Sequence, residues 1–425
     1  MRTIKINHLA KTEGQLSFSG ALVDGNFAQA RIETEEGARL IEGILLNRKY
    51  YEAPVITSRI CGICPIVHNL TSIKALEQAL NVKVTSEIVL LREILLNAQF
   101  IHSHALHAFF LSFPDLIGIS NNFDLVKKFP RESRLALEMR DWGLELARVI
   151  AGRTVHPINS VVGGFNVEPD IVELTRLNDE ADAVLEKAIK FFEFIKKQKL
   201  PSFVNPANYL SLVRSSEYAI YDGEVYFFDN DKKISASETL SLIEEIVLPH
   251  ERVKRVKHFN QPLMVGALAR VNNGYEQLNP QARKCWNSLK LEMPCYNSFY
   301  NIFAQAVEII HCVEAIKKLF NQYYTTHKLK GFNKRLKIKF KPNPGRGAAV
   351  MEAPRGLLFH EYELDRDGNI LHCNIITPTA IFLANLENDL GRLIIENGKL
   401  SENKMKHLIK TLIRAYDPCI SCATH

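Results

Sequence analysis

The segment RICGICPIVH, residues 59–68, contains two cysteines separated by two residues and followed by a proline and a histidine. The glycine inside the pair lets the backbone turn tightly enough for the sulfurs of Cys61 and Cys64 to face one point. Pro65 suits the first position of a helix, so Cys64 would lie at a helix N-terminus, where the dipole favours a thiolate. His68 follows one turn later and could donate a hydrogen bond back toward Cys64. The segment predicts a pair of metal-binding thiolates.

A second pair lies in the segment DPCISCATH, residues 417–425, at the other end of the sequence. Cys419 and Cys422 repeat the spacing of the first pair, and His425 follows them. Because chain ends are usually frayed, so many potential ligands in so few residues indicate that something, such as a metal, fixes this end. The two pairs together predict a buried site of four thiolates where an N-terminal and a C-terminal segment meet.

The residues alone leave the identity of that metal open. One Cys-x-x-Cys motif also fits a redox dithiol or half of a zinc site, although no βαβ pattern surrounds Cys61. Structural zinc pairs are normally close in sequence, whereas these lie at opposite ends of the chain. Four thiolates are a suitable ligand set for nickel, zinc or an iron–sulfur cluster.

The chain outside the two pairs is rich in helical patterns. Their length and hydrophobicity predict a central bundle of long helices. Pro114 and Pro201 are expected to end two of them. The predicted helices cover residues Ser86–Phe113, Glu132–Ala151, Glu173–Lys199, Ser298–His327 and Glu402–Tyr416.

Strand patterns occupy the periphery of the sequence, and two Asp-Gly steps, at residues 24–25 and 367–368, predict hairpin turns. With no internal repeat, low-complexity stretch or linker, residues 1–425 are expected to form a single domain. The predicted fold is α-rich α+β, with a central long-helix bundle and peripheral β-hairpins. The predicted strand segments are Thr3–Asn7, Gln15–Val23, Asn26–Glu33, Ala219–Phe228 and Leu357–Ile375.

Composition excludes several classes of function. The net charge of +6 is small for 425 residues, and the absence of a zinc finger or aromatic–basic repeat argues against nucleic-acid binding. No apolar run reaches the roughly 18 residues of a membrane span, and Met1–Asn7 contains no signal-peptide core. We therefore expect a soluble, cytoplasmic protein with reduced thiols, in which Cys285, Cys295, Cys312 and Cys373 form no disulfide framework.

The two cysteine segments resemble the signature motifs of nickel–iron hydrogenase large subunits. Residues 59–68 match Arg-x-Cys-Gly-x-Cys-x-x-x-His in full, and residues 417–425 match Asp-Pro-Cys-x-x-Cys-x-x-His in full. Residues 103–115, 352–356 and 376–379 agree as well, so the resemblance covers nearly the whole chain. The related subunit of respiratory complex I usually lacks these cysteines, so their presence favours a catalytic hydrogenase of the cytoplasmic classes linked to NAD(P), a deazaflavin or ferredoxin.

The resemblance implies a nickel–iron centre and a reaction. Nickel would be bound by all four cysteines, with Cys64 and Cys422 bridging to an iron that carries cyanide and carbon monoxide. Cys61 and Cys419 would be terminal nickel ligands. Hydrogen would be split heterolytically, with the proton passing to Cys419 and then to Glu13. Glu13-Gly14 resembles an Arg-x-Glu-Gly segment whose glutamate gates proton exit, although Lys11 replaces the arginine; without the resemblance, Glu13 would be a surface turn residue.

Further residues gain roles from the same resemblance. Arg355, after Pro354, would lie over the open face of the metals, bond a cyanide and polarise hydrogen. Asp115 and Asp417 would position that arginine, and Thr379 would donate to the second cyanide. Without the resemblance, these are an arginine in a surface turn, two ordinary aspartates and a strand threonine.

A second metal site is implied near the C-terminus. Glu42, His425 and the backbone of Ile375 match the positions that hold a structural magnesium or iron, and an oxygen-rich shell suits magnesium. Without the resemblance, Glu42 would be a carboxylate on a helix surface.

Electron transfer requires partners, because the chain has neither a spare cysteine pattern for iron–sulfur clusters nor a dinucleotide fingerprint. The resemblance implies an iron–sulfur small subunit, flavin or diaphorase-type subunits, nickel chaperones and a maturation protease that removes an extension after the final histidine. A sequence ending at His425 fits the mature form, or a gene without an extension. A regulatory hydrogen sensor and a zinc-stabilised scaffold of a redox complex are the alternative functions.

Overall fold

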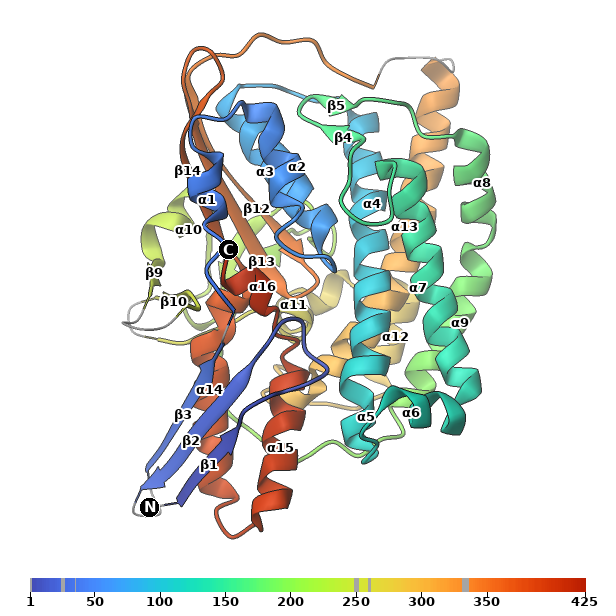
Figure 1. The fold of residues 1–425 in the computed structure, drawn as a ribbon. Coiled ribbons are helices and arrows are strands. Elements are labelled where there is room, and N and C mark those ends of the chain that lie inside the picture. Colours follow the sequence, from blue (N-terminus) through green and yellow to red (C-terminus); the bar gives the residue numbers. More distant parts are fainter. Residues whose placement is uncertain (1, 24–26, 35, 248–251, 259–260, 331–335) are drawn as a thin grey trace.

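The computed structural model describes residues 2–23, 27–34, 36–247, 252–258, 261–330 and 336–425. Long helices stand together on one side of the molecule, and small sheets with their covering helices form the other side (Figure 1). The predicted α-rich α+β class is therefore confirmed. The C-terminal residue lies in the middle of the molecule, between the sheets and the first helices.

The helical side is built around α4 (Ser86–Ala105), which packs against α7 (Pro130–Ala151) and α13 (Asn301–Lys330), while α9 (Ala181–Ile195) packs on α7 and α13 (Figure 1). From Leu91 onward almost every side chain of α4 is buried. A helix that is buried on all sides lies at the centre of its bundle, and the polar side chains that it carries, such as Arg92 and Gln99, are hydrogen-bonded there.

Two predicted helix boundaries were wrong. Pro114 does not end the first helix, because α4 continues through the π-helical segment η2 (Leu106–Ser112) into α5 (Phe113–Leu116). Pro114 lies at the second residue of α5, directly after the π-helical segment, and the helix ends two residues later. The segment predicted as one helix up to Lys199 is divided at Glu180 into α8 (Ile171–Asp179) and α9. The sequence did not reveal this break, because apolar residues continue at helical spacing across it.

A three-stranded antiparallel sheet lies beside the bundle. Its strands are β12 (Gly345–Ala353), β13 (Gly356–Leu364) and β14 (Ile370–Ile376), in that order. The hairpin predicted at Asp367-Gly368 joins β13 to β14, and Gly368 adopts a left-handed φ of 76°. Strand β12 was not predicted; it packs against α3 (Pro65–Ala79), the helix that follows the first cysteine pair.

The contact between β12 and α3 depends on a glycine. A Cβ atom on Gly347 would lie 2.3 Å from the backbone nitrogen of Ala79 and 2.4 Å from the carbonyl oxygen of Ala75. We expect Gly347→Ala to lower the free energy of unfolding by about 1–3 kcal/mol, because the backbone of α3 must move to accept the methyl group. Thermal or urea denaturation measures this. Gly37→Ala is the control, since a Cβ there meets nothing within 4 Å, and equal stability of the two variants would contradict the prediction.

The N-terminal residues form a second antiparallel sheet of β1 (Arg2–Ile6), β2 (Ser17–Val23) and β3 (Phe27–Glu33). It contacts α14 (Pro378–Glu396) and α15 (Glu402–Ala415) (Figure 1). Strands β2 and β3 pair as the predicted hairpin, whereas the turn residues 24–25 lie outside the described residues. Helix α15 was predicted; α14 was missed.

The remaining elements connect these layers. The predicted strand at residues 219–228 is reduced to β7, in a four-stranded sheet of order β11-β6-β7-β8. The connecting elements are α1 (Ile41–Leu45), η1 (Tyr50–Glu52), α2 (Ala53–Thr57), α6 (Asn122–Lys128), β4 (Ser160–Val161), β5 (Gly164–Phe165), β6 (Asn208–Val213), β7 (Glu224–Phe227), η3 (Phe228–Asn230), β8 (Lys232–Ile234), α10 (Ala236–Leu242), β9 (Glu244–Ile246), β10 (Arg255–Lys257), β11 (Leu263–Met264), α11 (Ala267–Gly274), η4 (Tyr275–Gln277), α12 (Pro280–Asn287), η5 (Ser298–Tyr300) and α16 (Ile420–Ala423).

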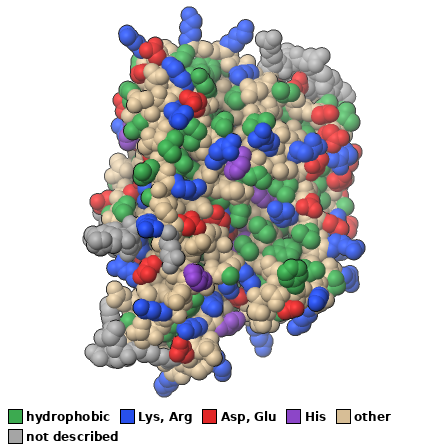
Figure 2. Space-filling model, in the orientation of Figure 1, with side chains coloured by type: hydrophobic (Ala, Val, Ile, Leu, Met, Phe, Trp, Pro, Cys, Tyr) green, Lys and Arg blue, Asp and Glu red, His purple; other side chains and the backbone are tan. Residues whose placement is uncertain are grey.

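Buried apolar side chains form two clusters. One fills the helical bundle and includes all four cysteines of the two pairs, and the other lies between the N-terminal sheet, α14 and α15. On the face shown in Figure 2, basic, acidic and hydrophobic side chains are interspersed. Within the described ranges, no helix is both long and apolar enough to cross a membrane.

Candidate metal centre

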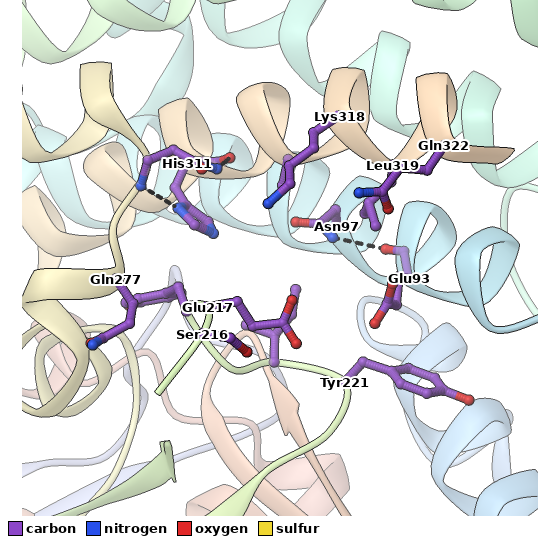
Figure 3. A pocket seen from close by; sticks show the side chains of 14 residues that line it. Glu93, Asn97, Ser216, Glu217, Tyr221, Gln277, His311, Lys318, Leu319 and Gln322 are labelled. Atoms are coloured by element: carbon purple, nitrogen blue, oxygen red, sulfur yellow. Dashed lines mark hydrogen bonds between the residues drawn. The ribbon is translucent and has the colours of Figure 1, made fainter. Parts of the chain in front are cut away.

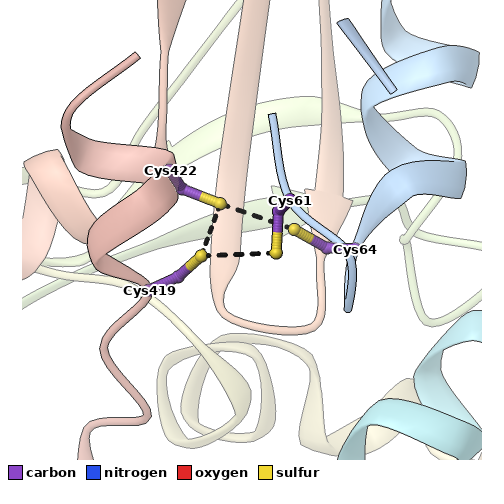
Figure 4. A group of neighbouring side chains, drawn as sticks. All are labelled: Cys61, Cys64, Cys419 and Cys422. Carbon is purple, nitrogen blue, oxygen red and sulfur yellow. Dashed lines mark hydrogen bonds between the residues drawn. The ribbon is translucent and has the colours of Figure 1, made fainter. Parts of the chain in front are cut away.

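The two cysteine pairs meet in space. Cys61 and Cys64 lie in the loop before α3, and Cys419 and Cys422 lie at the start and inside of α16 (Figure 4). Their four sulfurs are all within 4.8 Å of one another. The distances Cys61 Sγ–Cys419 Sγ and Cys64 Sγ–Cys422 Sγ are both 3.5 Å. No side chain of the four is more than 3% exposed, so the thiols face one another inside the protein.

The first pair is shaped by its own sequence and by one helical side chain. Cys64 caps α3 and Pro65 begins it, as predicted. Gln99, on α4, donates from Nε2 to the carbonyl oxygen of Ile63 at 2.8 Å and accepts from the backbone nitrogen of Val67 at 2.8 Å. The loop is thereby fixed on both sides of Cys64.

The second pair is held by residues from the N-terminal part of the chain. The backbone nitrogen of Ile420 donates to the carbonyl oxygen of Glu13 at 3.0 Å. The guanidinium of Arg39 donates to the carbonyl oxygen of Ile60 at 2.7 Å and also to that of Ser421. One arginine therefore joins the two cysteine segments.

The charges of the thiols fit a thiophilic metal. Hydrogen bonds donated by the other thiols, first by Cys419, hold the pKa of Cys61 well below its ordinary value. Burial raises the pKa of Cys419 and Cys422 well above theirs. A bound metal would hold the four thiols as thiolates and release their protons. This donor set suits nickel and iron.

Arg355 lies in the turn between β12 and β13, buried at 4% exposure. Its Nε donates to the backbone oxygen of Asp417 and its Nη2 to Oδ1 of the same residue, both at 2.8 Å. Burial lowers its pKa, but the charges of Asp417 and of the thiols outweigh burial and raise it well above the ordinary value. Its Nη1 has no hydrogen-bond partner among the described residues. A charged, buried donor next to the thiols is thus left available for a group bound there.

Asp115 lies elsewhere than predicted. Its carboxylate bonds to the guanidinium of Arg414 and lies 3.7 Å from Lys11 Nζ. The described side chains therefore pair Asp115 with Arg414 and Lys11, and the aspartate that Arg355 contacts is Asp417. Lys11, the departure from the family pattern, places its side-chain nitrogen beside this aspartate.

His68 was expected beside Cys64, the cysteine of its own segment. Its Nε2 lies instead 3.7 Å from the sulfur of Cys422. The prediction of Cys64 as the partner of His68 was wrong. It rested on the one-turn spacing along α3, and that spacing does not report that the C-terminal segment with Cys422 packs against the same ring. Burial lowers the pKa of His68 to about 3, so the ring is neutral and holds one N–H for a sulfur.

Glu13 and Thr379 both contact Cys419. Glu13 Oε2 lies 3.1 Å from the sulfur of Cys419 and accepts from the backbone nitrogen of Ser421 at 3.0 Å. The hydroxyl of Thr379 accepts from the backbone nitrogen of Cys419 at 3.0 Å, so its own hydrogen remains for another acceptor. Glu13 is only partly buried, so this carboxylate lies between the buried thiols and the surface.

The three residues predicted for a second cation lie together. The Nε2 of His425 lies 2.8 Å from the carbonyl oxygen of Ile375 and 3.9 Å from Oε1 of Glu42. The same Oε1 accepts from the backbone nitrogen of Ile375 at 2.8 Å, and Lys254 Nζ lies 2.7 Å from the other carboxylate oxygen. The carboxylate and the carbonyl oxygen are ligands suited to magnesium, and the imidazole is a ligand suited to iron; a magnesium site here is consistent with the family.

A surface cavity lies away from the thiols. It is lined by Glu93 and Asn97 of α4, by His311 and Lys318 of α13, and by Tyr221 of the segment before β7 (Figure 3). None of the four cysteines lines it. The metal chemistry therefore belongs to the buried cluster and not to this cavity.

Sequence reasoning missed the residues that support the centre from a distance. Arg39 and Gln99 hold the cysteine segments, and Gln305 Nε2 donates to Oδ2 of Asp417 at 3.4 Å. The only local signal was a polar side chain inside an apolar helix, as with Gln99 and Gln305, and that signal does not say what the side chain contacts.

Comparison with known proteins decides the family. A model of the nickel-dependent hydrogenase family matches residues 39–128 and 251–425. The chain belongs to this family. It is a hydrogenase catalytic subunit, and its four cysteines are positioned to bind a nickel–iron centre.

Individual relatives extend over the full length of this hydrogenase chain. Sulfhydrogenase 1 subunit alpha of Pyrococcus furiosus is 31% identical over 424 residues, 99% of this chain and 97% of that one. NAD-reducing hydrogenase HoxS subunit beta of Cupriavidus necator is 29% identical, covering 100% and 95%. A crystal structure of an NAD+-reducing [NiFe]-hydrogenase in the H2-reduced state superposes with a TM-score of 0.89 at 27% identity, covering both chains completely. These relatives are subunits of larger hydrogenases.

Proposed function

We propose that this hydrogenase chain splits hydrogen heterolytically and passes the electrons to an iron–sulfur partner subunit and on to a soluble acceptor such as NAD(P). One observation carries the proposal: four buried thiols share a space with a charged guanidinium that has a free N–H, and one thiol touches a carboxylate that lies toward the surface. These are the parts that heterolytic cleavage requires: a metal site, a group that polarises hydrogen and a proton acceptor.

The close contacts between segments support the proposed metal ligation. We assign Cys64 and Cys422, one close pair, as bridging ligands between nickel and an iron with cyanide and carbon monoxide, and Cys61 and Cys419, the other, as terminal nickel ligands. When bound, the two metals would supply a Lewis-acidic centre for hydrogen, and the chain's own side chains would take the proton. The unpartnered Nη1 of Arg355 is the proposed donor to one cyanide.

Three neighbouring residues complete the proposed cofactor pocket. The hydroxyl hydrogen of Thr379 is the proposed donor to the other cyanide. His68 donates to the sulfur of Cys422, and Pro354 shapes the turn that presents Arg355. Asp417 is assigned to hold that guanidinium in place.

The chain's own side chains then provide a proton path. Each hydrogen molecule yields two protons and two electrons. The sulfur of Cys419 takes a proton and Glu13 Oε2, 3.1 Å away, accepts it next. Because the backbone N–H of Ser421 holds that carboxylate in place, the transfer needs no large movement of Glu13.

Glu13→Gln is expected to leave the metal site assembled and to block proton traffic. Glutamine keeps the shape and can still accept from Ser421, but it has no oxygen that takes up a proton. Hydrogen–deuterium exchange catalysed by the enzyme should fall by about 100-fold or more, while the infrared bands of the iron ligands stay unchanged. Exchange at the wild-type rate would contradict the proposed proton transfer and leave Glu13 as an ordinary turn residue.

The surface near the first cysteine pair, Cys61 and Cys64, supports the proposal of a partner subunit. The short helices α1, η1 and α2 carry several exposed apolar side chains, and they lead directly into the loop with Cys61. Grouped exposed apolar side chains mark interaction surfaces. We propose this surface as the docking site of the iron–sulfur subunit, with electrons leaving the metals there. The exposed side chains are Leu40, Ile44, Leu46, Tyr51 and Val55.

The remaining assignments rest on the family and on the local geometry. We propose magnesium, or iron, at Glu42, Ile375 and His425, and a single domain over residues 1–425. Flavin or diaphorase-type subunits, nickel chaperones and a maturation protease stay predicted partners. The name of the NAD-reducing relative favours a soluble nucleotide acceptor. A cytoplasmic location stays a prediction.

The test uses the chain purified together with its partner subunits. One nickel per chain, with one iron more than the iron–sulfur clusters of the partner account for, and rapid hydrogen-dependent reduction of an artificial acceptor would support the catalytic role. Zinc alone would favour a scaffold, and very slow turnover a hydrogen sensor. Reduction of NAD, NADP, a deazaflavin or ferredoxin by the same complex identifies the acceptor. Loss of turnover with natural acceptors, but not artificial ones, when the iron–sulfur subunit is removed supports the proposed electron route.

A further inference from the structure

Arg270, on α11, lies directly behind the turn that carries Arg355. Its Nη1 donates to the carbonyl oxygen of Ala353 and its Nη2 to that of Pro354, both at 2.9 Å. These are the two residues immediately before Arg355. Arg270 is only 1% exposed, so these contacts are shielded from water.

The guanidinium of Arg270 is itself fixed by two buried carboxylates. Glu308 of α13 accepts from Nε at 2.6 Å and from Nη2 at 2.7 Å, and Glu352 accepts from Nη1 at 2.8 Å. Together with the two carbonyl oxygens, these contacts give five acceptors for the five N–H groups of an arginine. Glu308 also accepts from Tyr218 at 2.6 Å and bonds to His104 at 2.8 Å, so it is held as well.

The turn has little freedom to move away from this support. A Cβ atom on Gly356 would lie 2.6 Å from Cβ of Val265 and 2.8 Å from the backbone nitrogen of Gly266, the residue that precedes α11. The start of α11 therefore packs directly on the residue after Arg355, while Arg270, one turn into the same helix, holds the residues before it. The side chain of Arg355 is fixed in turn by Asp417, whose carboxylate accepts a hydrogen bond from the guanidinium.

We propose that Arg270 is a positioning residue for hydrogen turnover, which fixes the backbone of the Ala353-Pro354 turn so that Arg355 presents its free Nη1 to the group bound by the four thiols. The inference rests on the function proposed for Arg355. Lysine could not replace this arginine, because one ammonium cannot serve two carboxylates and two carbonyl oxygens with a planar fork. Buried ion pairs add little net stability compared with packed apolar side chains, so stability alone does not require this arrangement.

The chain offers a matched control in Arg92 of α4. It is also fully buried and pairs with both carboxylate oxygens of Glu77, at 2.7 and 2.8 Å, but its backbone contact is with Val161 and not with the Arg355 turn. Arg92→Lys therefore loses a buried fork of the same kind at another place. Any general effect of weakening a buried arginine–glutamate pair is common to both variants.

The experiment compares Arg270→Lys and Arg92→Lys in the complete, metal-loaded complex. We expect Arg270→Lys to lower kcat per bound nickel by about 100-fold at saturating hydrogen, because a misplaced guanidinium loses the productive geometry. The infrared bands of the iron ligands should shift, and backbone amides in residues 353–358 should exchange with deuterium faster. Arg92→Lys should keep wild-type kcat per nickel, infrared bands and exchange in that segment.

A double variant tests whether Arg270 acts through Arg355. Arg270→Lys combined with Arg355→Lys should be no slower than Arg355→Lys alone, because the guanidinium to be positioned is then absent. Wild-type kcat per nickel in Arg270→Lys, additive losses in the double variant, or equal losses in Arg92→Lys would each overturn the proposal.

If Arg270→Lys does not assemble, Glu308→Gln supplies the same comparison with a neutral side chain of equal shape. A loss of kcat per nickel and faster amide exchange at residues 353–358 support positioning, and unchanged values overturn it. A wild-type complex that loads nickel and iron but does not turn over hydrogen would instead refute the function proposed for the whole site.

Discussion

Replacing any one of Cys61, Cys64, Cys419 or Cys422 with serine is expected to abolish nickel binding, hydrogen turnover or both. The four sulfurs lie within 4.8 Å of one another in a buried space, so one metal ion can contact all four of them. A serine hydroxyl is a harder ligand than a thiolate and does not ionise near neutral pH, so the metal loses a ligand that nothing nearby replaces. Metal analysis of the purified complex and a hydrogen-uptake assay measure the effect.

Cys312→Ser is the matched control, because Cys312 is just as buried, at 1% exposure, but lies on α13 in the apolar core. Burial raises its pKa well above the ordinary value, so it behaves as a small neutral hydrophobic side chain. The variant should lose some stability and keep its nickel. Loss of nickel equal to that of Cys419→Ser, without loss of stability, would contradict the assignment of four ligands.

Arg355→Lys is expected to retain nickel and iron but to lose most of its turnover at saturating hydrogen. The lysine keeps a positive charge near Asp417. It loses the planar guanidinium, in which Nε and Nη2 bond Asp417 while Nη1 stays free for another acceptor. Loss of one preorganised donor to a transition state typically lowers the rate by about 100- to 1,000-fold. Metal content, measured beside kcat, separates this effect from failed assembly.

Such a variant also tests the assignment of Nη1. If the donor bonds a cyanide on iron, the cyanide bands in the infrared spectrum should shift in Arg355→Lys and stay in place in Arg346→Lys, since Arg346 is paired with Glu361 at the surface. Wild-type turnover in Arg355→Lys would make Arg355 a turn residue only. Proton transfer would then rest on Cys419 and Glu13 without it.

The ligands could be predicted from sequence because their signal is local. A Cys-x-x-Cys pair with a proline after it specifies its own turn and helix start, as Cys64 and Pro65 do. Long helices such as α13 were also predictable, because apolar periodicity over many residues admits few other structures. The missed β12 is an edge strand that α3 covers, so its residues from Gly347 to Ala353 are all buried. The missed α14 packs between the N-terminal sheet and β10. Burial on both faces removes the periodicity that identifies a strand or an amphipathic helix.

The partners of the site residues were less predictable. His68 was assigned to Cys64 by its spacing along α3, but its ring lies beside Cys422. Asp115 was assigned to Arg355, but Arg414 and Lys11 take its carboxylate. In both cases the true partner comes from a segment remote in sequence, and no local pattern reports which remote segment packs there.

The sequence by itself determined the chemistry of this protein: which side chains bind metal, that they come from both ends of the chain, and which long helices enclose them. Only the tertiary structure decided how the centre is held, through Arg39 between the two cysteine segments, Gln99 on the first loop and Arg270 behind the Arg355 turn. The physical reason is that ligand identity is a property of a few adjacent residues, whereas a buried hydrogen bond exists only once packing has brought its donor and acceptor together and excluded water.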